Sequence, residues 1–356
     1  MESLADIDFD ARLTHLDPDA MRAAVRAFPD HFREGWSRAA SVEGLDWTAT
    51  DFDAVVVCGM GGSAIGGDLT RTYCEATSPV PTAVVRGYDL PAYVGPKTLV
   101  VASSYSGGTE ETLSAFQQAL DRGATVLCVT TGGTLLDAAK REGLAHVVVP
   151  GGLQPRAALG YSFSVLLRLA RALGMTDLPD ADLDAALDEA TARAATYAQT
   201  TDNPALELAD TLYGKLSVIY SGAGFLEAVN LRWRTQIHEN AKAPAVGNLF
   251  AELNHNEIMG FEAAPVAISQ QMGIVVLRDA DDHAQIQKRI DITRGLLEDS
   301  VASWTEVESE GTTRLGRMLS LLQLGDSVSF WLAMLQDVDP TPVDTIQALK
   351  KTLAES

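Results

Sequence analysis

The sequence predicts an α/β protein of two domains, each with a parallel sheet that is flanked by helices on both faces. Short continuous apolar runs alternate with helical segments, as in parallel sheets whose strands are buried on both sides. The alternation begins near residue 54, stops near residue 150 and restarts near residue 216. A chain of 356 residues is long enough for two cores. We therefore expect a first domain over residues 1–175 and a second over residues 176–356.

The first domain is expected to begin with short helices around residues 16–36 and an entry turn at 44–51. Strands are expected at residues 54–58, 82–85, 98–103, 125–130 and 145–149. Helices are expected at residues 64–74, 110–123 and 162–173. Pro150-Gly151-Gly152 marks the end of the alternation, because glycine and proline interrupt both helices and strands.

The second domain follows an alanine- and aspartate-rich helical connection over residues 177–210. Strands are expected at residues 216–221, 266–268, 273–277 and 303–307. Helices are expected at residues 225–242, 284–297, 312–334 and 340–353. The strand, the turn Gly222-Ala223-Gly224 and the helix at its start repeat the plan of the first domain, although the sequences do not repeat.

The chain is strongly acidic, with 48 acidic and 27 basic residues and a net charge of −21. Only seven of the basic residues are lysine, and the acidic residues are dispersed along the chain. A dispersed acidic, lysine-poor surface indicates an organism with a salty cytoplasm, where salt screens the self-repulsion. An ordinary acidic enzyme is the alternative. This charge disfavours nucleic acid as a partner, and an anionic substrate would need a local pocket of donors.

No apolar run reaches the length of a membrane span, and the acidic N-terminus lacks a signal-peptide core. We therefore expect a cytoplasmic protein without a membrane partner.

The three cysteines, Cys58, Cys74 and Cys128, form no CxxC pair. Cys58 and Cys128 lie in strand-like runs, where buried, inert thiols are expected rather than disulfides or metal ligands.

The segment CGMGGSAIGGDL, residues 58–69, places five glycines directly after the first strand. Its Gly59–Ala64 part satisfies the nicotinamide fingerprint G-x-G-x-x-G/A. That fingerprint also needs an acid at the end of the second strand to hold the ribose. The strand ends in Val85-Arg86-Gly87 instead, and Asp89 comes thirty residues after Gly59, later than expected. We therefore expect no dinucleotide cofactor and interpret the loop as a phosphate site.

A second loop, SSYSGGT at residues 103–109, follows the third strand and opens a helix. Ser104, Ser106 and Thr109 offer three hydroxyls, and the helix N-terminus adds a favourable field for an anion. Ser63 lies at the matching place after an adjacent strand, and ligands of open parallel sheets bind at this edge. One such loop alone is equally well explained by helix capping. Two loops at one sheet edge favour a single phosphate monoester.

Two further residues are candidates for proton transfer. Glu239 lies near the end of the expected helix 225–242, on one face with Arg232 and Gln236. A carboxylate near a cation is a candidate base, although a surface ion pair is the alternative. His255 lies in the polar turn NHNE, where it could exchange protons near neutral pH or cap a helix.

No metal site is expected from these residues. His238-Glu239 is not part of an HExxH motif, and His255 and Glu257 are two residues apart, so they do not share a helix face.

The two loops CGMGGSAIGGD and SSYSGGTEET resemble the phosphate-binding loops of sugar isomerase (SIS) domains. Three later stretches, LQPRAALGYSF, RWRTQIHENAKAPA and ELNHNEIMGF, resemble the archaeal-type bifunctional phosphoglucose/phosphomannose isomerases of that superfamily. The resemblance covers nearly the whole chain after about residue 50, and the ordered set of five stretches is highly specific. It implies two SIS-type domains with the active site between them.

The resemblance also implies an activity and residue roles. A metal-independent isomerase would interconvert glucose 6-phosphate and mannose 6-phosphate with fructose 6-phosphate through a cis-enediol. Glu239 would move the proton between C2 and C1, and Arg156 would stabilise charge on the enediolate oxygens. His255 would help to open the sugar ring from the neighbouring subunit, which makes an isologous homodimer obligatory. Phosphate would be held by Gly62, Ser63, Ser104, Ser106 and Thr109.

The resemblance assigns a lysine to the C-terminal helix, where Lys350 and Lys351 both fit. Lys350 is favoured because it adjoins the face expected to be buried, which carries Val343, Ile346 and Leu349. A solvated helix end, where the helix dipole favours lysine, is the alternative. Thr341 is a further candidate for the pocket.

One position departs from the family, which usually has asparagine where this chain has His238, directly before the expected base. Two other functions remain open. A sugar-phosphate-binding SIS regulator without catalysis would usually carry a helix-turn-helix, but no basic recognition segment is present. An aminosugar-phosphate isomerase or deaminase would often use different acids or a glutaminase domain.

Overall fold

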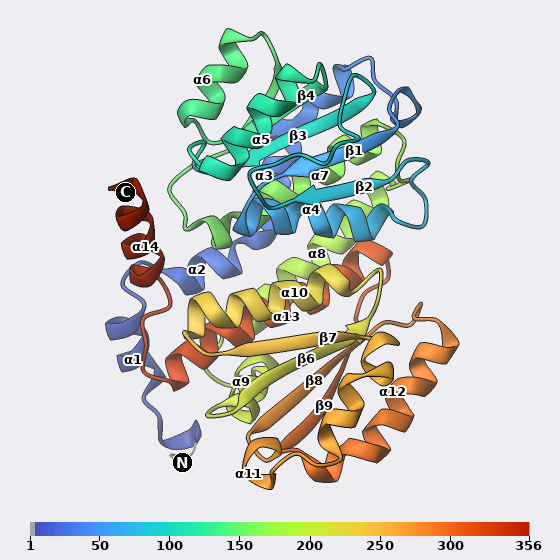
Figure 1. The fold of residues 1–356 in the computed structure, drawn as a ribbon. Helices are drawn as coiled ribbons and strands as arrows, with labels where there is room; N and C mark the ends of the chain where they lie inside the picture. The colour runs from blue at the N-terminus through green and yellow to red at the C-terminus, as the bar shows by residue number, and fades with distance from the viewer. Residues whose placement is uncertain (1–3, 356) are drawn as a thin grey trace.

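The computed structural model describes residues 4–355 and contains two parallel sheets, which lie at opposite ends of the molecule (Figure 1). The first sheet has five strands in the order β2-β1-β3-β4-β5, and the second has four in the order β7-β6-β8-β9. The neighbouring strands in both sheets are parallel. The predicted class, two α/β units with helices on both faces of each sheet, is confirmed.

The first sheet is built from the apolar runs that the sequence marks as strands. These are β1 (Ala54–Cys58), β2 (Thr82–Val85), β3 (Thr98–Ser104), β4 (Thr125–Thr130) and β5 (Ala145–Val148). Because strand side chains alternate, Val55 and Val57 face one layer of helices, and Val56 and Cys58 face the other. The two layers are α4 (Gly61–Cys74) with α7 (Leu159–Ala172), and α5 (Glu110–Asp121) with α6 (Gly133–Arg141).

The second sheet differs from the prediction in two elements. Its strands are β6 (Leu216–Gly222), β7 (Ala245–Phe250), β8 (Met272–Arg278) and β9 (Ser303–Glu308). The strand expected at residues 266–268 is instead a helical turn, α11 (Val266–Ser269), because so short an apolar run does not distinguish strand from helix. The edge strand β7 was not predicted, because Gly247 and Asn248 interrupt its apolar pattern.

Helices cover the second sheet and join the two halves. The inner layer contains α10 (Glu227–Gln236) and α13 (Arg314–Leu335), and α12 (Ala284–Leu297) covers the outer face. The connection consists of α8 (Asp180–Tyr197) and α9 (Pro204–Leu212), which both pack on α13. At the N-terminus lie α1 (Phe9–Leu16), α2 (Met21–Arg26) and α3 (Phe28–Arg38), of which α3 packs on α7.

The two halves share one core. The inner faces of both sheets, the N-terminal helices and the helices between the sheets belong to a single apolar cluster, whereas each outer face has a smaller cluster of its own.

Cys58, Cys74 and Cys128 are free and buried, and burial raises the pKa of each thiol to about 12. The expectation of buried thiols at Cys58 and Cys128 is therefore confirmed.

Helix α13 corrects the expectation that no segment is long and apolar enough to span a membrane. Among residues 4–355, α13 alone satisfies that test by length and composition. Its apolar window is 100% buried in the protein. The helix is apolar all round because neighbours surround it, including α8, α9 and α10.

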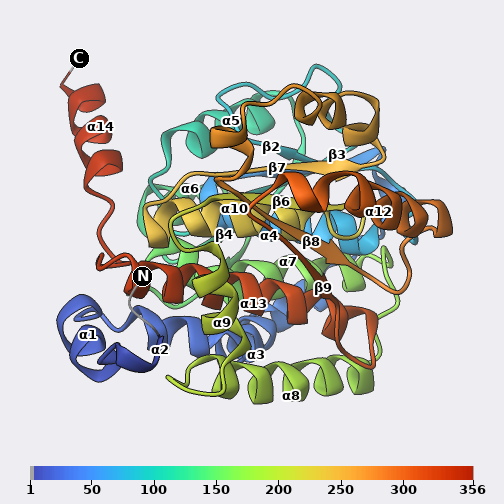
Figure 2. The same cartoon turned by 90° about the horizontal axis from the view of Figure 1, so that it is seen from below.

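The C-terminal helix α14 (Asp344–Ala354) corrects a second expectation. It projects from the body of the molecule in both views (Figures 1 and 2). The face expected to be buried is open in the single chain, since Ile346 is 42% exposed and Leu349 is 60% exposed. Nearby Leu353 is 59% exposed.

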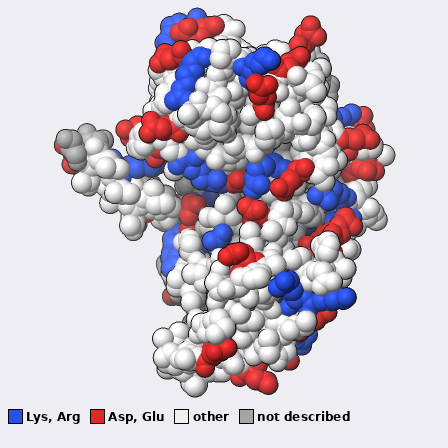
Figure 3. All heavy atoms as spheres, turned by 45° about the vertical axis from the view of Figure 1, so that its right-hand side comes forward, with Lys and Arg blue, Asp and Glu red and all other residues white. Residues whose placement is uncertain are grey.

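On the face shown in Figure 3, acidic and basic side chains lie side by side. On the face shown, several Lys and Arg side chains gather along the waist between the two halves. The chain is thus acidic as a whole but not uniformly so, and an anion can meet positive charge locally.

Candidate active site

The two glycine-containing loops meet where the first sheet reverses its direction of winding. In the order β2-β1-β3, the connections after β1 and β3 leave to opposite sides, and ligands of open α/β sheets bind in the crevice so formed. A Cβ at Gly59 would lie 2.9 Å from the carbonyl oxygen of Ser103. The backbone N–H of Tyr105 donates to Ser63 Oγ at 3.2 Å. The predicted adjacency of the loops is therefore what the structure shows.

The second loop is organised by its own hydroxyls. Ser104 Oγ and Thr109 Oγ1 lie 2.8 Å apart, and the N–H of Gly107 donates to Ser104 Oγ at 3.1 Å. Ser106 is exposed, and its Oγ accepts from the N–H of Gly108 at 3.3 Å. Gly107 has φ +70°, and a Cβ there would lie 1.8 Å from a carbonyl oxygen, so only glycine fits.

Neither helix that follows these loops has a side-chain cap. Met60 is the N-cap of α4, and Thr109 is the N-cap of α5, but Thr109 pairs with Ser104 instead of the first-turn amides. Thr109 therefore does not cap α5 with its side chain, contrary to the alternative explanation of this loop as a helix cap. Amides at an uncapped helix N-terminus favour an anion, and here two such termini adjoin the same sheet edge.

Arg156 lies beside the first loop, in the short 3-10 turn η4 (Pro155–Ala158). A Cβ at Gly62 would lie 2.6 Å from the carbonyl oxygen of Pro155, so the loop and the turn are in direct contact. Arg156 is 3% exposed. Burial lowers the pKa of Arg156 and the carboxylate of Glu239 opposes this effect, but an arginine remains charged in a protein.

Glu239 comes from the second half of the chain and faces Arg156. Helix α10 passes into a π-helical turn, η5 (Ile237–Ala241), which carries Glu239. Its Oε2 atom lies 3.5 Å from Nη1 of Arg156. The side chain of Arg156 is 2% exposed and that of Glu239 is 32% exposed, so the carboxylate is open to a ligand while its cation is not.

Arg232 is not the cation of this pair, contrary to the expectation from helical spacing. It forms a bidentate pair with Asp326, with both N–O distances 2.8 Å. Gln236 is buried at 1% exposure, whereas Glu239 is partly open. The spacing rule fails because the α-helix ends at Gln236 and the π turn changes the face on which later residues lie.

Two further groups at the site were not identified from the sequence. Lys242 Nζ donates to the carbonyl oxygens of Glu239 at 2.5 Å and Pro340 at 3.0 Å. Burial and the neighbouring Arg156 lower the pKa of Lys242. Asn240 is fully buried and accepts from Arg156 Nε at 2.6 Å. Lysine is scarce in this chain, and that scarcity could have marked Lys242 as a candidate site residue. Nothing about Asn240 in the sequence distinguishes it from other asparagines.

Thr341 does adjoin the site. Its carbonyl oxygen accepts from Arg156 Nη2 at 2.9 Å. The residue is 5% exposed, and its buried hydroxyl has no hydrogen-bond partner among the described residues. Thr341 thus remains a pocket candidate with hydroxyl capacity to spare.

His255 and Lys350 are not brought to the Arg156–Glu239 pair within one chain. His255 is exposed at the end of the 3-10 turn η6 (Glu252–His255), after β7. The following residues are anchored to the second sheet, because Glu257 accepts from Tyr220 and Asn248. Lys350 and Lys351 are both exposed on the projecting helix α14.

His238, which stands where the family usually has asparagine, points away from the Arg156–Glu239 pair. Its Nε2 atom lies 2.9 Å from the carbonyl oxygen and 3.0 Å from the nitrogen of Ala245, at the start of β7. The neighbouring histidine therefore supports the edge strand instead of lining the site.

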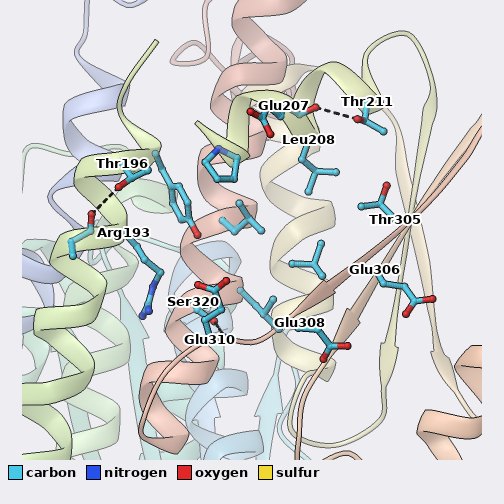
Figure 4. Close-up of a pocket in the computed structure, with 16 residues that line it drawn as sticks. Arg193, Thr196, Glu207, Leu208, Thr211, Thr305, Glu306, Glu308, Glu310 and Ser320 are labelled. Carbon is cyan, nitrogen blue, oxygen red and sulfur yellow. Dashed lines mark hydrogen bonds between the residues drawn. The ribbon is translucent and has the colours of Figure 1, made fainter. Parts of the chain in front are cut away.

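A cavity of about 690 Å³ lies elsewhere, between α8, α9, β9 and α13 (Figure 4). Four carboxylates line it, from Glu207, Glu306, Glu308 and Glu310, against the single cation Arg193. This charge opposes binding of a phosphate, and the cavity contains none of the candidate residues.

Among residues 4–355, no cluster of three or more His, Cys, Asp or Glu residues could hold a metal ion.

Comparison with known proteins places both halves in one superfamily. Residues 51–150 match the family described as SIS domain, and residues 201–353 match the bacterial phospho-glucose isomerase C-terminal SIS domain. The chain is 44% identical to a bifunctional phosphoglucose/phosphomannose isomerase of Caldicellulosiruptor bescii, over 94% of this chain and 99% of the relative. It is 37% identical to the protein of that description from Aquifex aeolicus, over 90% and 96% of the two chains.

A solved structure supports the fold alone. A hypothetical protein from Thermus thermophilus superposes with a TM-score of 0.74, at 17% identity, over 98% of this chain and 94% of the other.

Proposed function

The chain belongs to the family of bifunctional phosphoglucose/phosphomannose isomerases, and we propose that the Arg156–Glu239 pair and the two adjoining loops form its active site. The enzyme is an aldose–ketose isomerase that interconverts glucose 6-phosphate and mannose 6-phosphate with fructose 6-phosphate. One observation carries the assignment of the site. Glu239 Oε2 faces Nη1 of Arg156 at 3.5 Å, and Arg156 lies in the turn that contacts the first loop.

The phosphate of the substrate is proposed to bind between the two loops. Ser63, Ser104, Ser106 and Thr109 supply hydroxyls, and the backbone around Gly62 approaches closely because it has no side chain. The hydroxyls now pair with one another and with loop amides. A phosphate can replace these contacts with charge-assisted hydrogen bonds, which are stronger.

Glu239 is proposed as the base of the proton transfer. Its carboxylate takes the proton from C2 of the aldose and returns it to C1, through a cis-enediol, while the proton of the C2 hydroxyl passes to O1. The negative charge that develops on the enediolate oxygens lies beside the Nη1 donors of Arg156, whose orientation is already fixed by buried contacts. In the reverse direction the proton is delivered to C2, which is planar in the enediol, so the face that receives it decides between the glucose and mannose configurations.

The site is proposed to be completed by a second copy of the chain. His255 is exposed and anchored on the second sheet, so it is available to a neighbouring subunit for ring opening. Helix α14 exposes Ile346, Leu349 and Leu353, which a second copy would cover. An isologous homodimer uses the same surfaces twice and would complete two sites. Lys350 is proposed to reach a site once α14 is packed.

The setting of the enzyme is also a proposal. Free sugar phosphates are metabolites of the cytoplasm, so we expect the enzyme to act there in carbohydrate metabolism. We expect salt tolerance from the net charge of −21. A domain boundary near residue 175 is supported by the two family matches, which lie over residues 51–150 and 201–353.

The experiment is to incubate the purified protein with fructose 6-phosphate in molar KCl with EDTA and to quantify both aldose phosphates. Formation of glucose 6-phosphate and mannose 6-phosphate supports the dual, metal-independent activity. Formation of only one aldose phosphate refutes the dual specificity for this chain. If neither forms but fructose 6-phosphate raises the melting temperature, the chain is a binding module and the proposed catalytic roles are wrong.

A further inference from the structure

We propose that Asn240 is a positioning residue, which holds the guanidinium of Arg156 so that its Nη1 edge faces Glu239. This inference rests on the proposed roles of Arg156 and Glu239 in the isomerase reaction. The side chain of Asn240 bonds to Arg156 and Ser329 and not to the carboxylate of Glu239, so it would act on the reaction through the cation.

The donors of Arg156 show which edge of the guanidinium is left for the site. An arginine side chain has five N–H donors. Nε donates to Asn240 Oδ1 at 2.6 Å, and Nη2 donates to the carbonyl oxygens of Pro340 at 2.6 Å and Thr341 at 2.9 Å. Nη1, with the remaining donors, faces Glu239 Oε2 at 3.5 Å. Asn240 therefore fixes the rotation of the guanidinium together with the two carbonyl oxygens, and it is the only side chain among these three acceptors.

The amide of Asn240 is itself oriented by a buried serine. Ser329 Oγ donates its one proton to the carbonyl oxygen of Asp326 at 2.6 Å. The same Oγ can then only accept from Asn240 Nδ2, at 3.0 Å. The amide nitrogen of Asn240 thus faces Ser329, and the amide oxygen faces Arg156. Both Asn240 and Ser329 are fully buried, so water does not compete for these bonds.

The backbone of Arg156 is held from the same point on α13. Arg232 Nη2 donates to the carbonyl oxygen of Arg156 at 2.7 Å, while Arg232 is held by the carboxylate of Asp326. Asp326 therefore acts on Arg156 twice. Its carboxylate fixes the main chain through Arg232, and its carbonyl fixes the side chain through Ser329 and Asn240.

The π turn brings the base and the positioning residue to one guanidinium. Glu239 and Asn240 are consecutive in η5 (Ile237–Ala241), yet both contact Arg156. Consecutive residues of a regular α-helix point in directions about 100° apart, whereas π turns are rare and are frequently found at functional sites. This geometry accounts for a change of helix type at the position of the base.

The test uses Asn240→Ala and Ser329→Ala, with Asn230→Ala as a matched control. Asn230 is also buried, lies in the preceding α10 and donates to Ile219 and Ser221, but it does not contact Arg156. We expect Asn240→Ala to lower kcat by about ten- to a hundredfold while KM for fructose 6-phosphate stays within about twofold. Ser329→Ala should lower kcat less. Asn230→Ala should lower the melting temperature without lowering kcat per folded molecule.

The double variant Asn240→Ala/Ser329→Ala shows whether Ser329 acts through Asn240 or whether the two residues act independently. If Ser329 acts through Asn240, the double variant should be no slower than Asn240→Ala alone. The proposal is overturned if Asn240→Ala keeps the parental kcat, if its KM rises as much as its kcat falls, or if the two losses multiply. Glu239→Gln distinguishes a failure of the proposed function: near-parental turnover in that variant refutes the base itself, whatever Asn240→Ala shows.

Discussion

Nη1 of Arg156 lies 3.5 Å from Oε2 of Glu239, although the two residues belong to different halves of the chain. Arg156 is in a turn at the end of the first half, and Glu239 is in a π turn of the second. The contact joins a buried cation to a partly open carboxylate. The proposed base is thus held beside a fixed cation, next to the two loops proposed to bind phosphate, as stabilisation of an enediolate intermediate would require.

Glu239→Gln should abolish turnover and leave ligand binding largely intact. Glutamine keeps the shape of the side chain but cannot accept a proton, so kcat should fall by about 10²–10⁴-fold. The Kd of a phosphate-bearing competitive inhibitor should stay close to the parental value, because the loops are unchanged. Near-parental turnover in this variant would show that another residue is the base.

Ser104→Ala should mainly weaken phosphate binding. The buried hydroxyl of Ser104 is central to the second loop, and its loss should cost about 1 kcal/mol or more of binding free energy if it meets a charged phosphate. Isothermal titration with inorganic phosphate or fructose 6-phosphate measures the change in Kd. Ser114→Ala is the control, since Ser114 lies in α5 outside the loop and donates to Tyr88. Equal Kd values for the two variants would contradict the role of Ser104.

A mixture of Glu239→Gln and His255→Ala proteins should regain activity that neither has alone. If His255 acts across the subunit interface, one of the two sites in each mixed dimer contains both intact residues. Random exchange of subunits should therefore restore about a quarter of the parental activity. The measurement is the isomerase rate before and after unfolding and refolding the mixture. A mixture that stays inactive while the size distribution shows dimers would place His255 and Glu239 in the same subunit.

Lys350→Ala should lower kcat/KM more than Lys351→Ala. Both side chains are exposed on α14 in the single chain, so the single chain itself offers no reason for a difference. A difference is expected only if α14 packs and directs Lys350 to a site, because adjacent helical residues point in directions about 100° apart. Steady-state rates for the two variants decide this, and equal values would remove Lys350 from the site.

Asp282→Asn should stabilise the protein above pH 6 but not below pH 4. Burial raises the pKa of Asp282 from its ordinary value of 3.8 to about 6. An acid with a raised pKa contributes stability in its protonated form, and this is lost as the pH rises through about 6. Asparagine removes the partly buried charge, so the free energy of unfolding at pH 8 should rise by at most about 3 kcal/mol, an upper bound because solvent screens part of the charge.

Urea denaturation of Asp282→Asn at pH 4 and pH 8 checks this expectation. The exposed Asp177 provides the control variant, Asp177→Asn, which should show no such dependence on pH. A gain in stability of equal size at both pH values would mean that Asp282 acts through packing and not through its charge.

Much of the fold was readable from local sequence. Every strand of the first sheet begins and ends within one residue of its predicted bounds, because each is a short, mainly apolar run between polar or turn-forming segments. The adjacency of the two glycine-containing loops was also predicted from the sequence, because each loop directly follows one of two neighbouring strands. The edge strand β7 was missed because Gly247 and Asn248 interrupt its apolar run.

The chemistry around Glu239 was decided by tertiary structure. Helical spacing favoured Arg232 as the partner, but Arg232 is neutralised by Asp326 from α13, and the π turn directs Glu239 to Arg156. A sequence specifies which residues carry charge and, over a few turns, which share a face. It does not specify which distant charge meets which, because that depends on packing between segments that are far apart in the chain. The residue types of the site were therefore determined locally, and their pairing was determined by the contact between the two halves.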